Sequence, residues 1–392
     1  MSAEKMSVPF FRASLGQEEK DAVLRVLESG WLTTGSEALL FEREFAELTG
    51  AGHALAVSSN TSGMILAMEA CGVRQGTSVI TTPYTFVSTA SSARHLGAHV
   101  IFADTEPGTY SIDPEHVERI LSGPEGKSVA TVVPVHIAGN VCDMERIVSA
   151  ARKHGVRVIE DCAHSFPSRT KSGYAGTLGD AGVFSFYATK TITTGEGGMV
   201  TTDDGSIAER ISSMRLHGMS RNAWDRYTAQ KASWEYDITA PGYKSNLPDI
   251  LACIGRAQLR RAHEFYHKRK ALAERYNESF REMDFIDLPP DAEGNAWHLY
   301  LMRLNLDRLK CTRGTFAQEM QEAGVGISVH FIPLFHFTYW KNLYPGLSAR
   351  DFPNAEQQFS RTISIPLWPD MTHEMQDHVI QTVRALGEKY HA

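Results

Sequence analysis

The amino-acid sequence predicts an α/β protein whose mostly parallel central sheet carries helices on both faces, followed by a smaller α+β domain. From residue 53 to about 205, short β-branched runs alternate with helical patterns. The strand runs are almost continuously apolar, as expected when helices cover both faces of a parallel sheet. Beyond Pro248 the alternation ends and a long helical stretch begins. We therefore expect a large domain at residues 1–248, including the N-terminal segment, and a small domain at residues 249–392.

The elements of the large domain follow from local patterns. Strands are expected at 54–58, 78–82, 99–103, 129–135, 156–159 and from 183 onward, and helices at 64–70, 85–96 and 143–154. A further helix begins after Asp113, because Asp113 can cap it and Pro114 suits the first helical position. Gly155 is expected to end the helix that precedes it.

The small domain has a different texture. A helical stretch at 249–283 is followed by a strand at 297–304, a helix at 315–323 and an extended segment at 326–331. One isolated strand among helices is typical of an α+β domain, since it cannot belong to a regular βαβ series.

Composition excludes several classes of protein. The 392 residues contain 39 Lys and Arg against 46 Asp and Glu, so no basic excess favours nucleic acid. No apolar run approaches the ~18 to 20 residues of a membrane span. The five cysteines form no C-x-x-C pair, and the spacing of His373, Glu374 and His378 does not match a zinc-protease motif. We expect a cytoplasmic protein without a metal site, a membrane partner or a nucleic-acid partner.

Ligands of open α/β sheets bind beyond the carboxyl ends of the strands, which here means just after Val57, Ile80 and Ile159. Three polar segments occupy such positions: 58–63, 160–164, and 185–198. The first leads from a strand into a helix and offers an anion site through backbone N–H groups and hydroxyls. Taken alone, each segment also fits a purely structural role: a helix cap, a core histidine with its hydrogen bonds made, or a solvent-exposed lysine.

Taken together, Asp161, His164, Ser185 and Lys190 in this order resemble the DegT/DnrJ-type sugar aminotransferases, which depend on pyridoxal 5'-phosphate (PLP) and have fold type I. Similar strings occur at 30–35, 59–61, 85–87, 160–164, 188–190, 192–198 and 242–246. The resemblance covers roughly residues 8 to 385 and is most specific from Lys190 to Gly198.

The resemblance implies PLP as the cofactor and a role for each matching residue. Lys190 would form the Schiff base and then move a proton at the substrate carbon. Asp161 would keep the pyridine nitrogen protonated, and His164 would lie near the cofactor hydroxyl. The other implied contacts are the phosphate contacts Thr61, Ser62 and Ser185, the stacking ring Phe86, and Asn246, which reaches the phosphate from the neighbouring subunit. A homodimer with shared active sites is therefore implied.

The implied reaction transfers an amino group, from L-glutamate, to a keto group of a nucleotide-linked deoxysugar by a ping-pong mechanism. The string at 30–35 resembles members that aminate carbon 4 of the sugar. Two alternatives stay open: an amino-cyclitol ketone as substrate, and a non-catalytic PLP-binding regulator. Nucleotide contacts are expected near 221–236 and 330–336, including Trp224, Arg226, Tyr227, Trp234, His330 and Phe331.

Four departures from the family pattern lie near the expected site: Ser36, Asn60, Tyr187 and Thr191. Asn60 stands where many members have a small residue, and Tyr187 replaces a common histidine. These changes leave the implied chemistry in place and put the identity of the substrate in doubt. Lys190 itself argues against the related sugar dehydratases, which have histidine at that position.

Overall fold

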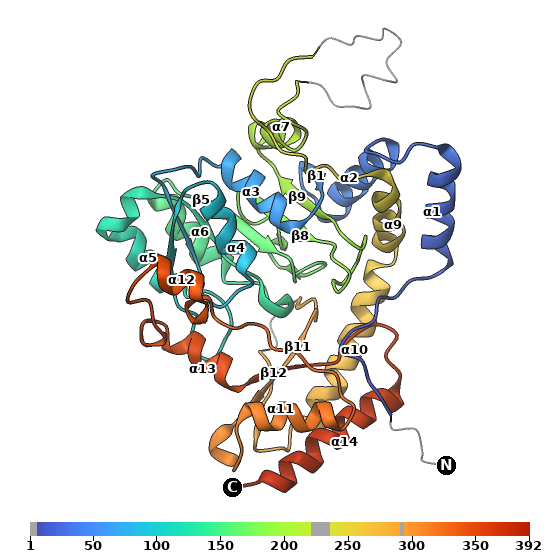
Figure 1. Cartoon of the computed structure of the whole chain (residues 1–392), viewed down its shortest axis with the longest axis vertical. Coiled ribbons are helices and arrows are strands. Elements are labelled where there is room, and N and C mark those ends of the chain that lie inside the picture. Colours follow the sequence, from blue (N-terminus) through green and yellow to red (C-terminus); the bar gives the residue numbers. More distant parts are fainter. Residues whose placement is uncertain (1–5, 221–235, 291–293) are drawn as a thin grey trace.

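The computed structural model describes residues 6–220, 236–290 and 294–392 (Figure 1). Its largest feature is a seven-stranded sheet, whose strands in spatial order are β1 (His53–Val57), β9 (Gly198–Thr202), β8 (Ala181–Ser185), β5 (Arg157–Cys162), β4 (Val129–Val133), β2 (Ser78–Thr81) and β3 (His99–Phe102). The strands from β8 to β3 pair in parallel, and β9 is antiparallel to both of its neighbours. The prediction of a mostly parallel sheet is confirmed.

Helices cover both faces of this sheet. One face carries α3 (Asn60–Ala70), α4 (Val87–His95) and α7 (Gly205–Met214), whose apolar side chains join one core cluster. The other face is divided between two clusters. The first contains α2 (Ser36–Thr49) and α9 (Asp249–Arg260), and the second contains α5 (Pro114–Ser122) and α6 (Met144–Lys153). The continuous apolar strands are explained by this burial from both sides.

Helix starts and ends follow the expected chemistry. Asp113 accepts a hydrogen bond from the backbone of Glu115, and Pro114 opens α5. Gly155 follows the end of α6 with a φ of 69°, a left-handed conformation that costs glycine little. Strand β5 is longer than predicted, because the polar side chains of Glu160 and Asp161 both find hydrogen-bond partners and can remain in the buried sheet.

The stretch at 249–283 forms two helices and not one. Helix α9 ends at Arg260, and α10 (Ala262–Phe280) begins after Arg261. Helix α9 packs against α2 and α1 (Gln17–Ser29), beside the large sheet, whereas α10 carries the chain away from it (Figure 1). The boundary at residue 248 stays a prediction.

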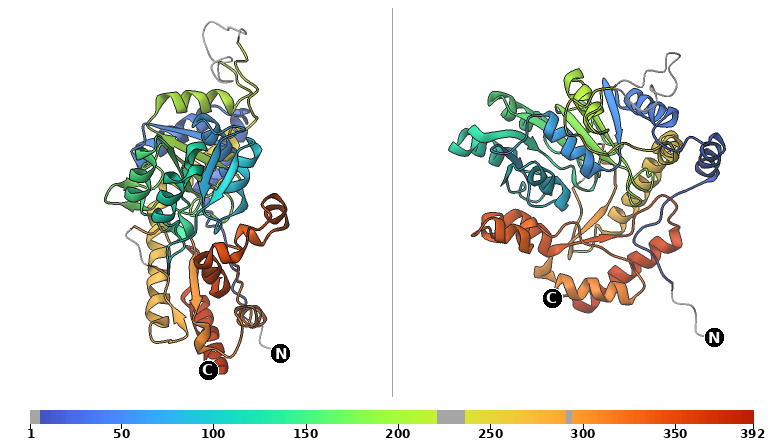
Figure 2. Two further views of the ribbon diagram at one scale, coloured as in Figure 1. Left: turned by 90° about the vertical axis from the view of Figure 1, so that its left-hand side faces the viewer. Right: turned by 45° about the horizontal axis from the view of Figure 1, so that its top comes forward.

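The C-terminal part contains a three-stranded antiparallel sheet of β10 (Ile286–Asp287), β11 (Tyr300–Leu304) and β12 (Thr362–Ile365). Its core includes side chains from α10, α11 (Arg313–Glu322) and α14 (His373–Tyr390). In both views of Figure 2 the orange-to-red C-terminal elements lie below the blue and green sheet. The N-terminal segment joins them, since Val8 exchanges backbone hydrogen bonds with Gly324 and Gly326.

The remaining elements are short. They are the hairpin β6 (Arg169–Thr170) and β7 (Gly173–Tyr174), the helices α12 (Thr338–Leu343) and α13 (Pro353–Arg361), and 3₁₀ turns at 124–128, 137–139, 306–308, 334–336 and 349–351. No helix in the described parts of the chain combines the length and the apolar character that crossing a bilayer requires.

Candidate active site

A cavity of about 620 Å³ lies where the carboxyl ends of β1, β5 and β8 face the C-terminal sheet. Six of the eight predicted site residues line it: Thr61, Phe86, Asp161, His164, Ser185 and Lys190. Ser62 and Asn246 are not among the lining residues. These six residues therefore share one cavity beyond the strand ends, and their roles there stay predictions.

The start of α3 forms one end of the cavity. The hydroxyl of Ser59 caps the helix by accepting a hydrogen bond from the backbone of Ser62 at 3.1 Å. The hydroxyl of Ser62 lies 3.1 Å from the backbone nitrogen of Ser59 and completes a capping box. The hydroxyl of Ser62 is thus used in capping its own helix, whereas Thr61 and Ser185 line the cavity. Helix N-termini with nearby hydroxyls bind anions well.

Asp161 is the buried carboxylate of the cavity. One carboxylate oxygen accepts hydrogen bonds from the side chain of Asn60 at 3.3 Å and from the backbone of Ala163 at 3.1 Å. The other accepts from the hydroxyl of Thr89 at 2.7 Å, and Thr89 in turn lies 2.9 Å from the hydroxyl of Thr85. A carboxylate has about four lone-pair positions, so one remains for a ligand.

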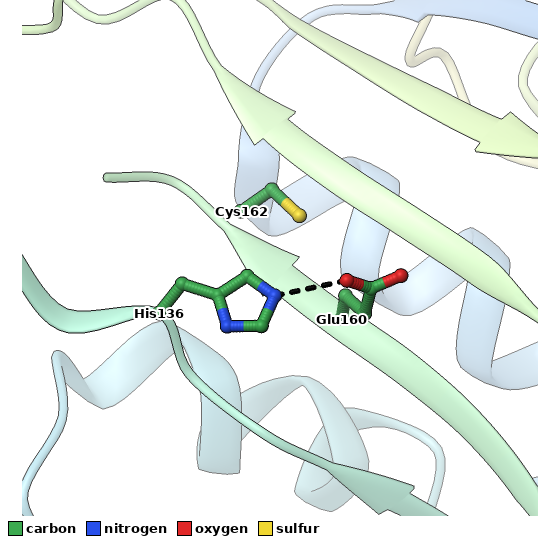
Figure 3. A group of neighbouring side chains, drawn as sticks. All are labelled: His136, Glu160 and Cys162. Atoms are coloured by element: carbon green, nitrogen blue, oxygen red, sulfur yellow. Dashed lines mark hydrogen bonds and ion pairs between the residues drawn. The ribbon is translucent and has the colours of Figure 1, made fainter. Parts of the chain in front are cut away.

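Glu160 points to the opposite face of β5, because side chains alternate along a strand. Its carboxylate lies 2.9 Å from Nε2 of His136 and accepts hydrogen bonds from the backbones of Gly176, Leu178 and Gly179. Figure 3 shows His136, Glu160 and Cys162 together, with possible ligand atoms within 4.8 Å of one another. Nδ1 of His136 already accepts a backbone hydrogen bond, and Glu160 has four donors. We interpret the cluster as a structural hydrogen-bonded pair, not as a metal site.

Lys190 follows β8 in a loop that returns to β9. Its backbone donates to the carbonyl of Tyr187 at 2.9 Å, and its amine reaches the cavity. No described residue forms a hydrogen bond or an ion pair with this amine. Burial lowers the pKa of Lys190 to about 8, although the charge of Asp161 acts in the opposite direction.

Gly198, at the end of the glycine-rich turn, allows β9 to approach the cavity wall closely. A Cβ atom at this position would lie 2.7 Å from the carbonyl oxygen of Phe184 and 2.9 Å from the backbone nitrogen of Asn60. Only glycine therefore lets β8, β9 and the start of α3 meet here.

His164 is held by the turn that follows β4. Its Nδ1 accepts a hydrogen bond from the backbone of Ala138 at 3.3 Å, so the proton of the neutral ring is on Nε2. Burial lowers the pKa of His164 well below its usual value, and the charges of Lys190 and His330 add to this effect. The residue is therefore a neutral imidazole at neutral pH.

The C-terminal part supplies a second wall. His298 and His330 line the cavity, and the ring centroid of His298 lies 4.4 Å from that of His164. Burial lowers the pKa of His330 to about 4, and Nδ1 of this residue lies 2.8 Å from the hydroxyl of Ser364. Phe10, from the N-terminal segment, stacks on His330 with centroids 5.7 Å apart.

The sequence reasoning missed Thr89, His298 and Phe10. Thr89 lies inside a helix, and His298 lies just before β11, near the start of the strand predicted at 297–304, so neither stands at the carboxyl end of a predicted strand. Phe10 precedes every predicted element. The departure from the family pattern at Asn60 did indicate a residue near the site, although its contact with Asp161 could not be predicted from the sequence.

The structure describes only some of the residues that were predicted to contact the nucleotide. Trp224, Arg226, Tyr227 and Trp234 lie outside the described residues. His330 and Phe331 line the cavity, whereas His336 is not among the lining residues and lies 2.6 Å from the carboxylate of Glu356.

Asn246 lies beside the carboxyl end of β1, with its backbone bridged to Val57. Its side chain donates to the hydroxyl of Thr34 at 2.6 Å and accepts from Lys244 at 2.7 Å. Within one subunit, Asn246 is not among the residues that line the cavity.

Comparison with known proteins gives a consistent picture. Residues 13–384 match the DegT/DnrJ/EryC1/StrS aminotransferase family. The chain is 42% identical to the spore coat polysaccharide biosynthesis protein SpsC of Bacillus subtilis over 380 residues, which is 96% of each protein. It is also 42% identical to the uncharacterized protein MJ1066 of Methanocaldococcus jannaschii, over 97% of this chain and 96% of the relative.

Solved structures agree with these relatives. The putative sugar aminotransferase Spr1654 of Streptococcus pneumoniae superimposes in its PMP-form with a TM-score of 0.90 at 28% identity, covering 97% of this chain and 99% of that one. Its PLP-form gives a TM-score of 0.89. Helicobacter pylori PseC, an aminotransferase in the biosynthesis of pseudoaminic acid, gives 0.89 at 27% identity, covering 98% of this chain and all of that one.

Proposed function

Because the chain belongs to the DegT/DnrJ/EryC1/StrS aminotransferase family and is a PLP-dependent sugar aminotransferase, we propose that it moves an amino group from L-glutamate to a keto group of a nucleotide-linked deoxysugar. The string at 30–35 favours carbon 4 as the position of amination. The cysteine pattern supports a reducing, cytoplasmic location. The observation that carries the proposal is the meeting of Lys190 and Asp161 in one cavity with an anion-binding helix start.

The cavity fits PLP in its chemistry. Lys190 offers an amine that bonds to none of the described residues, and Asp161 keeps one lone pair open for the pyridine nitrogen. Thr61 and Ser185 would hold the phosphate at the start of α3. Phe86 would stack on the ring. When bound, PLP withdraws electrons from the carbon that carries the amino group.

The protein side chains then have separate tasks. Asp161, whose three donors leave one acceptor position open, would accept the hydrogen bond of the protonated pyridine nitrogen. Lys190, with a pKa of about 8, can both accept and donate a proton at the substrate carbon near neutral pH. His164, whose Nδ1 already accepts a backbone hydrogen bond, would offer its Nε2 proton to the cofactor hydroxyl without adding charge.

We also propose a homodimer with shared active sites. Asn246, which lies apart from the lining of its own cavity, would reach the phosphate in the neighbouring subunit. The exposed rim supports this arrangement, since Phe86 and Tyr187 both line the cavity and are 58% and 46% exposed in the isolated chain.

The first experiment is the visible absorption spectrum of the purified protein before and after addition of L-glutamate. We expect a yellow PLP band that is replaced by the spectrum of the pyridoxamine form, because the donor half-reaction needs no sugar. The Lys190→Ala variant is the control, and its band should not respond at a comparable rate. A wild-type band that ignores L-glutamate would exclude this donor, and the absence of any band after addition of PLP would contradict the assigned site.

A further inference from the structure

Arg269, on α10, is a buried cation for which the described part of the chain supplies no counter-ion. Its side chain is 1% exposed, and it forms no ion pair with any described residue. Nη1 donates to the backbone carbonyls of His298 at 3.2 Å and Leu367 at 2.8 Å, while Nε has no hydrogen-bond partner. Burial lowers the pKa of Arg269 to about 10, so the group is still charged at neutral pH. A buried charge of this kind is costly unless an anion comes close to it.

Both carbonyls that bind Arg269 belong to residues that line the active-site cavity. Arg269 therefore lies directly behind the wall that the C-terminal part contributes. In front of it lies the imidazole of His298, which is 4% exposed. Neither ring nitrogen of His298 has a hydrogen-bond partner among the described residues, and its Nδ1 is fully buried. An imidazole left without partners at the wall of a cavity is suited to binding a ligand.

The same end of the cavity contains several further nitrogen groups. His164 packs against His298. Burial, together with the nearby cations Lys190 and Arg269, lowers the pKa of His298 well below its usual value. Burial keeps the three imidazoles neutral, and Lys190, with a pKa of about 8, can lose its proton, so Arg269 is the cation here that keeps its charge near neutral pH. The carboxylate of Asp161 accepts three hydrogen bonds from Asn60, Thr89 and Ala163, and Arg269 is not among its partners. The resulting positive potential favours an anionic ligand.

We propose that this end of the cavity binds the α-carboxylate of the amino donor, with His298 as the direct contact and Arg269 as the buried compensating charge. The inference rests on the proposed function, since it assumes an amino acid as donor. The α-carboxylate is attached to the carbon that carries the reacting amino group, so it must lie close to Lys190. The diphosphate of a nucleotide-linked sugar is separated from the keto carbon by the sugar ring and lies further away.

The test measures binding without chemistry. Glutarate has the carboxylates of glutamate but no amino group, so the PLP-loaded enzyme can bind it without reacting. Isothermal titration calorimetry should show an increase in the glutarate Kd of about 10- to 100-fold in His298→Phe, since a hydrogen bond to a charged group is lost. His378→Phe is the matched control, because this histidine, on α14, bonds the carbonyl of Ala323 and does not line the cavity. Its Kd should equal that of the wild type.

A second pair of variants tests the charge. Arg269→Lys keeps a cation and should weaken glutarate binding less than Arg269→Met. A Kd that is unchanged in His298→Phe, or a wild type that does not bind glutarate, would overturn the proposal. Inorganic pyrophosphate is the competing probe: if His298→Phe weakens its binding and leaves glutarate binding intact, the site binds a diphosphate and the proposal is wrong.

The subsite and the proposed function can fail separately. If L-glutamate converts the wild-type spectrum while His298→Phe binds glutarate normally, the donor is correct and the subsite is overturned. If the wild-type spectrum ignores L-glutamate while glutarate binding depends on His298, the carboxylate subsite is supported and the donor is another carboxylate-bearing amine.

Discussion

The side-chain amide of Asn60 joins Asp161 to the neighbouring strand. Nδ2 lies 3.3 Å from a carboxylate oxygen of Asp161 and 2.9 Å from the carbonyl oxygen of Val183. Asp161 and Val183 are paired residues of β5 and β8, and Asn60 is the first residue of α3. One side chain thus connects the anion-binding helix start with the buried carboxylate at the other end of the cavity.

Removal of a donor to Asp161 should weaken catalysis. We expect Thr89→Val to slow the half-reaction with L-glutamate about 10- to 100-fold, because the shortest of the three hydrogen bonds to the carboxylate is lost. Thr89→Ser, which keeps the hydroxyl, should restore most of the rate. Stopped-flow absorbance of bound PLP measures this rate. Equal rates for Thr89→Val and the wild type would show that Thr89 does not position Asp161.

The loss of charge at Asp161 itself should have a larger effect. Asp161→Asn keeps the shape of the side chain but cannot hold a proton on the pyridine nitrogen. By analogy with the loss of other preorganised electrostatic partners, we expect the activation free energy to rise by about 3 to 4 kcal/mol. The single-turnover rate with L-glutamate should therefore fall roughly several hundred-fold. An unchanged rate would mean that another residue contacts this nitrogen.

Lys190 gives a prediction about pH. Burial lowers the pKa of its amine to about 8, and only the neutral amine, which predominates above that pH, can attack a carbonyl carbon. The rate at which the PLP-free protein takes up PLP should rise with pH below 8 and level off above it. If the amine had the ordinary pKa of lysine, the uptake rate would continue to rise up to about pH 10. Uptake rates followed by absorbance between pH 6 and 10 distinguish the two profiles.

The pair of His136 and Glu160 should contribute to stability and not to metal binding. Glu160→Ala leaves the imidazole and three backbone N–H groups without an acceptor, and we expect the free energy of unfolding to fall by about 3 to 5 kcal/mol. Glu47→Ala, at an exposed ion pair, is the control and should change it by less than about 0.5 kcal/mol. Urea denaturation measures both.

A chelator tests the same cluster from the other side. Because the acceptor positions of Glu160 and His136 are filled by protein donors, EDTA should leave the melting temperature unchanged. A clear decrease would show that a metal ion occupies the cluster.

Asn246 tests the shared site. Inactive Asn246→Ala and Lys190→Ala variants, mixed under conditions that exchange subunits, should regain part of the wild-type activity, because each mixed dimer contains one intact site. Mass spectrometry of differently labelled subunits verifies exchange. Proven exchange with no recovered activity would contradict the proposal.

Much of the large domain could be predicted from sequence, because its strands are apolar and its ligand-binding segments follow them directly. Asp161, His164 and Lys190 were found in this way. The opposite wall could not be predicted. His298 and Phe10 reach the cavity only through the packing of the C-terminal sheet, and no local pattern in the sequence records that contact. Ser62 shows the reverse: its residue type suits an anion site, but the helix cap uses its hydroxyl.

The N-terminal segment has a consequence for the order of events during synthesis. Val8 bonds to Gly324 and Gly326, Trp368 bonds to the carbonyl of Pro9, and Phe10 stacks on His330. During synthesis, residues 8–10 therefore wait for partners translated more than 300 positions later. The side of the cavity where Phe10 stacks on His330 can form only after both of these distant segments have been made.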